Sequence, residues 1–234
     1  MKKTKKILAL ALAAVMLVSA TVAVTVAYLT STGSVTNTFT VGKVKITLDE
    51  LPVDLAGVPS IEGTDGFEPI PEEDIDTFEE RAAYEGRKKL NDYKLIPGHE
   101  YVKDPIVHVD ENSEKCYLFV TIVNEIEEIE NEDETVLSQM DAKGWVEFTD
   151  ANGNKVFKYE NPVDPAEEDV VLDIEVFERF VIADDADLKF DATGNSAYAG
   201  ETIVVTAYAV QFDGFATAEE AWNAAYVHNQ IENL

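Results

Sequence analysis

Three histidines are the side chains in this chain best suited to hold a metal ion or move a proton. His99, His108 and His228 stand far apart in the sequence. His99 precedes Glu100, but no second histidine follows one helical turn later, as a helical zinc-peptidase motif requires. Only coordinates can show whether the three converge. We expect surface imidazoles and no metal-binding residues.

A thiol or hydroxyl nucleophile also lacks support. Cys116 is the single cysteine, so no intrachain disulfide can form. It lies in an apolar stretch, which predicts a small buried hydrophobe and not a reactive thiol. The chain contains no Gly-x-Ser-x-Gly elbow. We therefore predict no catalytic residue and no cofactor, and expect that the protein is not an enzyme.

The segment Asp150–Asn154 carries oxygen ligands at alternate positions, as calcium loops do. However, Gly153 is misplaced for an EF-hand, and no glutamate closes the loop. Asn152-Gly153 is typical of a hairpin turn with positive φ. We expect such a turn, while the many carboxylates elsewhere leave weak, diffuse calcium binding open.

The N-terminal region has the three-part layout of a secretory signal. Four lysines occur within the first six residues, and the uncharged apolar run Ile7–Val26 follows. Small residues end at Ala27, which predicts cleavage between Ala27 and Tyr28 by a signal peptidase during export. The run is long enough for an uncleaved anchor, but the small-residue site favours cleavage. We expect residues 1–27 to be a signal peptide that contacts the membrane only transiently.

Net charge excludes some partners. The whole chain has 18 Lys and Arg against 46 Asp and Glu, a net charge of −28. Loss of residues 1–27 removes four lysines and no acid, which leaves a net charge of −32. Phosphates are repelled by such a surface, so the charge argues against nucleic acid and anionic lipid as partners.

Short strands separated by turn signals dominate the rest of the chain. Strands are expected at 38–48, 101–109, 115–123, 145–148, 155–159 and 202–211, with weaker ones at 93–96, 170–172, 179–183 and 188–190. A change of buried face near Gly42 suggests a bulge there. Along 115–123 both faces are apolar, which predicts a central strand covered on both sides.

Helices are expected in three places. An acidic insertion at about 49–92 carries a helix over 72–90, with Ile75, Phe78 and Ala82 on one side. A short helix should cover 135–143, after an acidic tract at 124–134 that we expect to be solvated. The last helix starts at a capping box. Thr217 and Glu220 form this box. The buried stripe of the helix consists of Ala218, Ala221, Trp222, Ala225 and Tyr226.

These elements predict a mainly β fold, namely an antiparallel β-sandwich with a few peripheral helices, preceded by the N-terminal signal helix. Strands and helices do not alternate regularly, so a parallel α/β sheet is not expected. Residues 28–234 are long enough for one domain with a sizeable core.

Three stretches together resemble a known family. They are Ala27–Leu48, Leu95–Pro105 with Cys116–Ile122 after it, and Ala199–Gln211. Their order and spacing resemble the TasA/camelysin family of Gram-positive bacteria, whose signal is processed by the dedicated SipW peptidase. The insertion at 49–90 and the tract at 124–134 depart from the family pattern.

The resemblance implies a jelly-roll β-sandwich and a secreted protein of the biofilm matrix or cell surface. It also implies fibre formation by donor-strand exchange, with the chain itself or another matrix protein as the partner. Tyr28–Thr40 is nearly uncharged and rich in Thr, Ser and Val, as an added strand should be. The candidate assembly residues are Tyr28, Leu29, Val35, Phe39 and Val41.

Other interpretations stay open at this level. The N-terminal segment could instead fold back as the first strand of its own domain. A camelysin-like metallo-endopeptidase is the alternative from the enzyme class, and a monomeric surface module that binds carbohydrate or protein is a third. Tyr93, Tyr101, Tyr117 and Tyr208 are better explained by sheet packing than by ligand binding.

Overall fold

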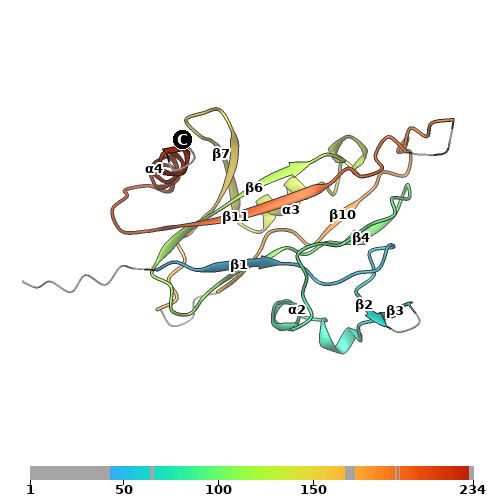
Figure 1. Cartoon of the computed structure of the whole chain (residues 1–234), viewed down its shortest axis with the longest axis horizontal. Coiled ribbons are helices and arrows are strands. Elements are labelled where there is room, and N and C mark those ends of the chain that lie inside the picture. The colour runs from blue at the N-terminus through green and yellow to red at the C-terminus, as the bar shows by residue number, and fades with distance from the viewer. Residues whose placement is uncertain (1–42, 64–65, 167–171, 193, 195, 232–234) are drawn as a thin grey trace, which may run out of the picture. The chain divides into compact units, whose positions relative to one another are not determined.

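The computed structural model describes residues 43–63, 66–166, 172–192, 194 and 196–231, so the predicted signal and the segment 28–41 lie outside them. The described chain is mainly β, and its paired strands are antiparallel, as predicted (Figure 1). The strands are β1 (Ile46–Asp49), β2 (Ser60–Gly63), β3 (Gly66–Pro69), β4 (Glu100–Val102), β5 (Ile106–Val109), β6 (Cys116–Asn124), β7 (Trp145–Thr149), β8 (Lys155–Tyr159), β9 (Asp173–Glu175), β10 (Arg179–Val181) and β11 (Ile203–Gln211). The helices are α2 (Phe78–Ala83), α3 (Val136–Ala142) and α4 (Ala218–Ile231), with 3-10 turns η1 (Glu72–Asp74) and η2 (Glu127–Ile129).

The largest sheet has the strand order β11-β6-β8-β7. β6 is central in it, which confirms the prediction for 115–123. Cys116, Leu118 and Val120 are buried on one face of β6, and Tyr117 and Phe119 are buried on the other. The apolar side chains at alternate positions of β6 are therefore buried on each of its two faces.

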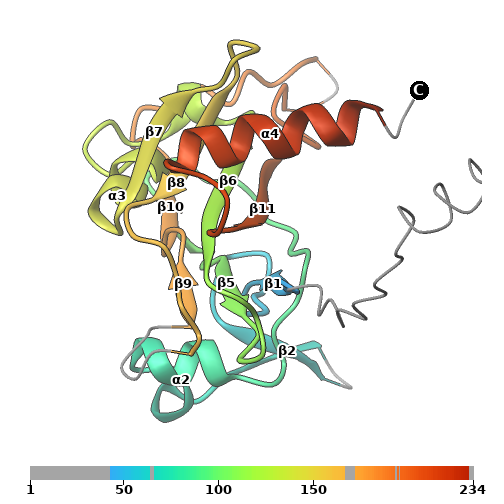
Figure 2. The same ribbon diagram turned by 90° about the vertical axis from the view of Figure 1, so that its left-hand side faces the viewer.

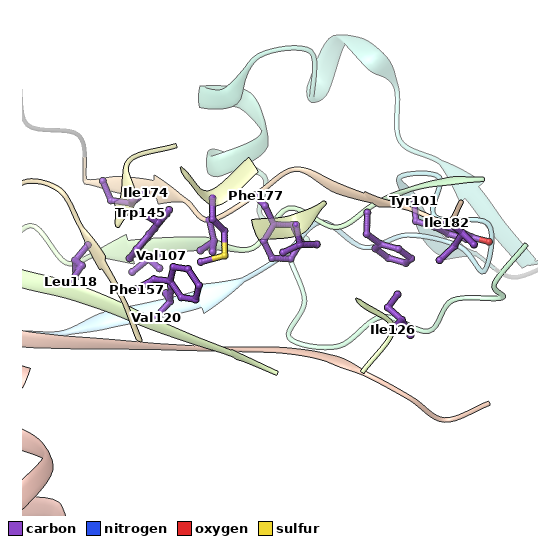
Figure 3. Packing of buried hydrophobic residues seen from close by; sticks show 14 of the residues in the cluster. Tyr101, Val107, Leu118, Val120, Ile126, Trp145, Phe157, Ile174, Phe177 and Ile182 are labelled. Atoms are coloured by element: carbon purple, nitrogen blue, oxygen red, sulfur yellow. The ribbon is translucent and has the colours of Figure 1, made fainter. Parts of the chain in front are cut away.

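The second sheet has the order β1-β5-β9 and shares one hydrophobic core with the first. The core contains Val107 from β5, Ile174 from β9 and Phe157 from β8 (Figure 3). Trp145 is 1% exposed, and its Nε1 donates to the Glu175 carbonyl at 2.9 Å. That bond satisfies the indole donor while its ring fills the space between the two sheets.

Helix α4 covers the outer face of the larger sheet (Figure 2). Ala218, Ala221 and Trp222 are buried there against Phe119 and Val156, which confirms those members of the predicted stripe. The stripe member Tyr226 lies outside the described side chains. No described helix combines the length and the apolar composition needed to cross a membrane.

The start of α4 differs from the predicted capping box in one bond. The Glu220 N–H donates to the Thr217 hydroxyl at 3.2 Å, as expected. The Glu220 carboxylate, however, accepts from the Ala216 N–H at 2.9 Å and not from Thr217. The same carboxylate still satisfies a free amide before the helix, one residue earlier in the chain.

The predicted helix over 72–90 is wrong in length. α2 has only six residues, and a hairpin of β2 and β3 precedes it in the insertion. Thr77 caps α2 with a complete capping box. The helix ends at Tyr84, and the chain then turns so that Arg87 pairs with Asp49 and with the buried Asp104, a path that a continuous helix would not follow.

The tract 124–134 is not a fully solvated excursion, contrary to expectation. Ile126, Ile129 and Glu130 are each 3 to 5% exposed, since η2 turns them into the protein. The predicted strand 101–109 is also broken, because Asp104 is buried and binds other segments between β4 and β5. Helix α3 and strand β11 agree with their predicted ranges.

The hairpin of β7 and β8 is confirmed, but its turn differs from the predicted one. Gly153 has φ +87°, whereas Asn152 is not among the residues with positive φ. The loop is organised by Asp150, whose carboxylate accepts from the Asn152 and Asn154 N–H groups at 2.9 and 2.8 Å. These bonds close a five-residue connection, whereas the sequence predicted a two-residue turn.

Candidate functional site

One edge of β11 carries backbone groups that no described strand pairs with. Phe212 N–H donates to the Lys115 carbonyl, and Glu125 N–H donates to the Thr202 carbonyl. The backbone N–H and C=O groups of the even-numbered residues of β11 therefore point toward β6. An antiparallel ladder bonds every second residue to a given neighbour. The backbone groups that point away from β6 therefore belong to Ile203, Val205, Ala207, Ala209 and Gln211.

Strand β1 lies beside β11 without being hydrogen-bonded to it (Figure 1). Asp110 N–H donates to the Lys45 carbonyl, so by the same alternation the backbone groups of Ile46 and Leu48 point away from β5. Beyond β1, Glu50 and Lys88 exchange two backbone hydrogen bonds of 2.8 and 2.7 Å. The segment after Arg87 thus pairs with the side of the chain that faces away from β5, but only at Glu50, just after the end of β1.

A hollow of about 610 Å³ lies at this end of β1 and β11. We call it the β11 groove; residues 88–95, 196 and 198–205 line it, together with Leu48, Phe180 and Leu188. Three of its lining side chains are large, apolar and well exposed, namely Leu90 at 76%, Phe190 at 64% and Val204 at 46%. Such exposed apolar groups around a concave surface are typical of interaction sites.

Buried charges fix the chain segment that forms one wall of the groove. The Arg87 guanidinium, 4% exposed, bridges Asp49 and Asp104, with 3.0 Å from Nη1 to the Asp104 carboxylate. It also donates to the Arg81 and Asp104 carbonyls. Burial raises the pKa of Asp104, and the adjacent Arg87 opposes that shift. A charge pair this deeply buried holds position well, because breaking it would strand a charge.

Aromatic rings support the same wall from inside. Tyr93 lies edge-on to Tyr101 and to Phe180, with ring centroids 5.8 and 5.1 Å apart. Its hydroxyl donates to the Val102 carbonyl at 3.1 Å, and burial raises its pKa. Both predictions that Tyr93 and Tyr101 serve packing are confirmed, since both rings lie against the main core.

The histidines do not form a common site in the described residues. His99 Nε2 bonds the Ala56 carbonyl at 2.8 Å. His108 lies between two carboxylates, with 2.8 Å from Nδ1 to Asp173 and 2.9 Å from Nε2 to Asp49. His228 lies outside the described side chains. No group of three potential metal ligands occurs among the described residues.

The two carboxylates around His108 act on both ring nitrogens. The hydrogen bond with Asp173 is the main cause that raises the pKa of His108, and Asp49 adds to it. Two acceptors favour an imidazolium with a proton on each nitrogen. Because Thr47, His108 and Asp173 are register partners, this contact ties β1, β5 and β9 together and presents no free nitrogen.

Cys116 is 0% exposed, which confirms the prediction that it is a buried residue. Burial raises the pKa of its thiol to about 11. Asp150 accepts hydrogen bonds within its own turn and one from Trp222 Nε1 at 3.4 Å. The Asp150–Asn154 segment therefore forms the turn of the β7–β8 hairpin, as predicted.

The residues proposed from sequence for cleavage and assembly lie outside the described residues. They are Ala27, Tyr28, Leu29, Val35, Phe39 and Val41. Sequence reasoning missed Arg87 and the lysines that follow it. A run of three basic residues, Arg87-Lys88-Lys89, in so acidic a chain was the available signal.

Comparison with known proteins returns no match: no family model, no curated protein and no solved structure is similar to this chain.

Proposed function

We propose that this protein is a secreted structural protein of a biofilm matrix or cell surface, built on a jelly-roll β-sandwich. Copies assemble by strand addition, in which the N-terminal segment of one copy pairs with the β11 edge of the next. The partner is a second copy or another matrix protein with a similar segment. The proposal assigns no enzymatic activity and no cofactor.

The edge of β11 that no described strand pairs with is the observation that carries this proposal. It offers N–H and C=O groups on five alternate residues over the nine-residue length of β11. An unpaired edge of this length is a template for another strand, since each added backbone group exchanges water for a hydrogen bond. The adjacent groove supplies apolar contacts for the side chains of an incoming strand.

The segment Tyr28–Val41 matches this edge in chemistry and length. It contains no charged residue and is rich in Thr, Ser and Val. At about 3.3 Å per residue, its 14 residues reach roughly 46 Å when extended, more than the nine residues of β11 need. Because the segment is uncharged, it adds nothing to the electrostatic repulsion between copies that each carry a net charge of −32.

A truncation tests whether this segment drives assembly. The mature chain 28–234 and a chain starting at Gly42 are compared by light scattering and electron microscopy. We expect only the longer chain to form fibres. Equal polymerisation of both chains would contradict the role of the segment. Retention of residues 1–27 in protein recovered from culture would contradict the predicted processing.

A proline variant tests the edge itself. In Ala207→Pro the lost N–H points away from β6, so the sheet keeps its internal bonds while an added strand loses one donor and meets the proline ring. Thr206→Pro is the matched comparison, because its N–H faces β6 and its loss weakens the fold directly. We expect Ala207→Pro to stay folded and to assemble poorly.

The alternative that the segment folds back on its own sheet gives a different result. Intramolecular pairing would occupy the same edge and yield a monomer at all concentrations. If both the mature chain and Ala207→Pro remain monomeric by sedimentation, self-assembly is wrong. Mixing experiments with other matrix proteins would then be the remaining test of a partner.

A further inference from the structure

A cluster of three polar side chains at one wall of the β11 groove has no part in the proposed assembly. The Lys103 Nζ lies 2.6 Å from Glu50 Oε2, and the Asn91 Nδ2 donates to Glu50 Oε1 at 2.9 Å. The Lys103 and Glu50 side chains are only 11% and 6% exposed. A single carboxylate, largely shielded from water, therefore holds an amine at one oxygen and a primary amide at the other.

The Asn91 amide is fixed at both of its ends. Its Oδ1 accepts from the Val53 N–H at 3.1 Å, and its Nδ2 donates to the Leu51 carbonyl at 2.8 Å as well as to Glu50. The amide therefore cannot turn away from the carboxylate without breaking three hydrogen bonds. Groups held together in this way react without the entropy cost of an encounter.

The surroundings of Lys103 are apolar and fixed. Its Nζ lies 6.0 Å from the centroid of the Tyr93 ring, which packs against the main core. The next residue, Asp104, is buried and accepts from the Leu51 N–H at 2.7 Å, so the backbone that carries Lys103 is held in place. A shielded ion pair is costly to desolvate, and transfer of one proton from Nζ to Glu50 leaves two neutral groups. The neutral amine is the nucleophilic form of lysine.

We propose that Lys103 and Asn91 join in an intramolecular amide cross-link, with Glu50 as the catalytic residue that carries protons between them. The Lys103 Nζ attacks the Asn91 Cγ, a bond forms between these atoms, and the bond from Cγ to Nδ2 breaks. Two protons pass from Nζ, by way of Glu50, to the departing nitrogen. The ammonium group of Lys103 and the amide of Asn91 thus give a secondary amide and an ammonium ion, and no other reactant is consumed.

Each stage of this reaction has a group already in contact with the reacting atom. Negative charge develops on the Asn91 Oδ1 during the attack, and the Val53 N–H that donates to this oxygen stabilises it. The Glu50 carboxylate contacts both the nitrogen that attacks and the nitrogen that leaves. It can therefore act first as the base and then as the acid.

The cross-link has a structural consequence. It would fasten the segment 88–95, which lines the groove, to the connection between β4 and β5. A covalent link between two positions of a chain restricts the unfolded state and so stabilises the folded one. This inference goes beyond the proposed assembly, because the bond forms within one copy and needs no partner.

Mass spectrometry of the purified chain 28–234 tests the cross-link. We expect an intact mass below that calculated from the sequence by about 17 Da, the mass of one ammonia. A proteolytic digest should yield one branched peptide that contains both Asn91 and Lys103. The full calculated mass, with the two residues recovered in separate peptides, would overturn the inference.

Matched variants assign the roles of the three residues. Lys103→Arg keeps a positive charge beside Glu50 but replaces the amine by a guanidinium, and Glu50→Gln keeps the size but accepts no proton. We expect both variants to have their full calculated mass. Lys45→Arg, at the exposed pair with Asp110, should still lose one ammonia. Circular dichroism checks that all three proteins are folded.

Ammonia can also leave an Asn-Gly pair when the asparagine cyclises to a succinimide, and Asn152-Gly153 is such a pair. A loss that persists in Lys103→Arg, or that maps to Asn152, would therefore overturn the inference. A cross-link that forms as fully in Glu50→Gln would overturn the role of Glu50. A cross-linked chain that never polymerises would contradict the assembly proposal alone, so the two proposals fail separately.

Discussion

Glu130 has a buried carboxyl group whose oxygens accept no hydrogen bond within the described residues. The residue is 5% exposed, and burial raises the pKa of its carboxyl to about 7. The nearby Asn124 amide opposes only part of that rise. A buried acid of this kind is kept neutral at low pH and becomes costly once it ionises.

This position predicts a pH dependence of stability. The folded pKa lies above that of a free glutamate, so the contribution of Glu130 is full below about pH 4.5 and is lost as pH rises through 7. We expect Glu130→Gln to gain on the order of 2 kcal/mol relative to the parent chain between about pH 5 and pH 8. Urea unfolding measures this.

Glu132→Gln is the control, because Glu132 is exposed in the same acidic tract. Its stability should follow that of the parent chain across the whole pH range. Parallel pH profiles for Glu130→Gln and the parent chain would show that Glu130 is not buried as described.

Cys116 predicts a second residue-scale result. Its side chain is inaccessible and burial raises its pKa to about 11, so almost no thiolate forms near neutral pH. We expect no reaction with a thiol-specific disulfide reagent at about pH 8 in the folded protein, and one equivalent of reaction in urea. Rapid labelling of the folded protein would contradict the position of β6 in the core.

At the scale of elements, His108 links the three strands of the smaller sheet. Its pKa is raised by Asp173 and Asp49, so its contribution to stability is full below about pH 6.5 and is lost as pH rises through the raised value. We expect His108→Gln to cost about 1 kcal/mol at pH 5.5 and much less at pH 9. Thermal unfolding at the two pH values measures the difference.

His99→Gln is the comparison for that experiment. His99 bonds a backbone carbonyl and has no carboxylate at either nitrogen among the described contacts. Its replacement removes a hydrogen bond to a backbone carbonyl and no contact with a carboxylate. If His108→Gln behaves in the same way, the two carboxylates do not hold the imidazolium.

The hairpin of β7 and β8 depends on Asp150 in a similar manner. The Asp150 carboxylate organises the turn and reaches Trp222 of α4 at 3.4 Å. We expect Asp150→Ala to destabilise the protein by about 1–3 kcal/mol, since two turn amides and the buried Trp222 indole lose this acceptor. Asp213→Ala, at an exposed position outside the turn, should have little effect. Equal losses in urea unfolding would contradict this role.

At the scale of the whole molecule, net charge controls association. Copies that carry a net charge of −32 after the proposed processing repel one another over about 10 Å at 0.1 M salt. We therefore expect fibre formation to accelerate when NaCl is raised from about 20 to 200 mM. Light scattering follows the rate. A rate that falls with salt would mean that attractive ion pairs, and not strand addition, limit assembly.

The sequence by itself predicted the long strands and the class of fold. β6 and β11 were recognisable because their side chains alternate over nine residues. Asn152-Gly153 placed a hairpin, and Thr217 marked the start of α4. Each of these signals is local, so it needs no knowledge of the rest of the chain.

The tertiary structure decided what local patterns could not. The helical periodicity of 72–90 was overruled because Arg87 binds carboxylates of Asp49 and Asp104, which are far from it in sequence. The acidic tract was drawn inward at Ile129 and Glu130 by packing against distant segments. The edge of β11 that no described strand pairs with lies beside the groove for the same reason: distance in space between remote residues depends on how the sheets pack, and no local pattern contains it.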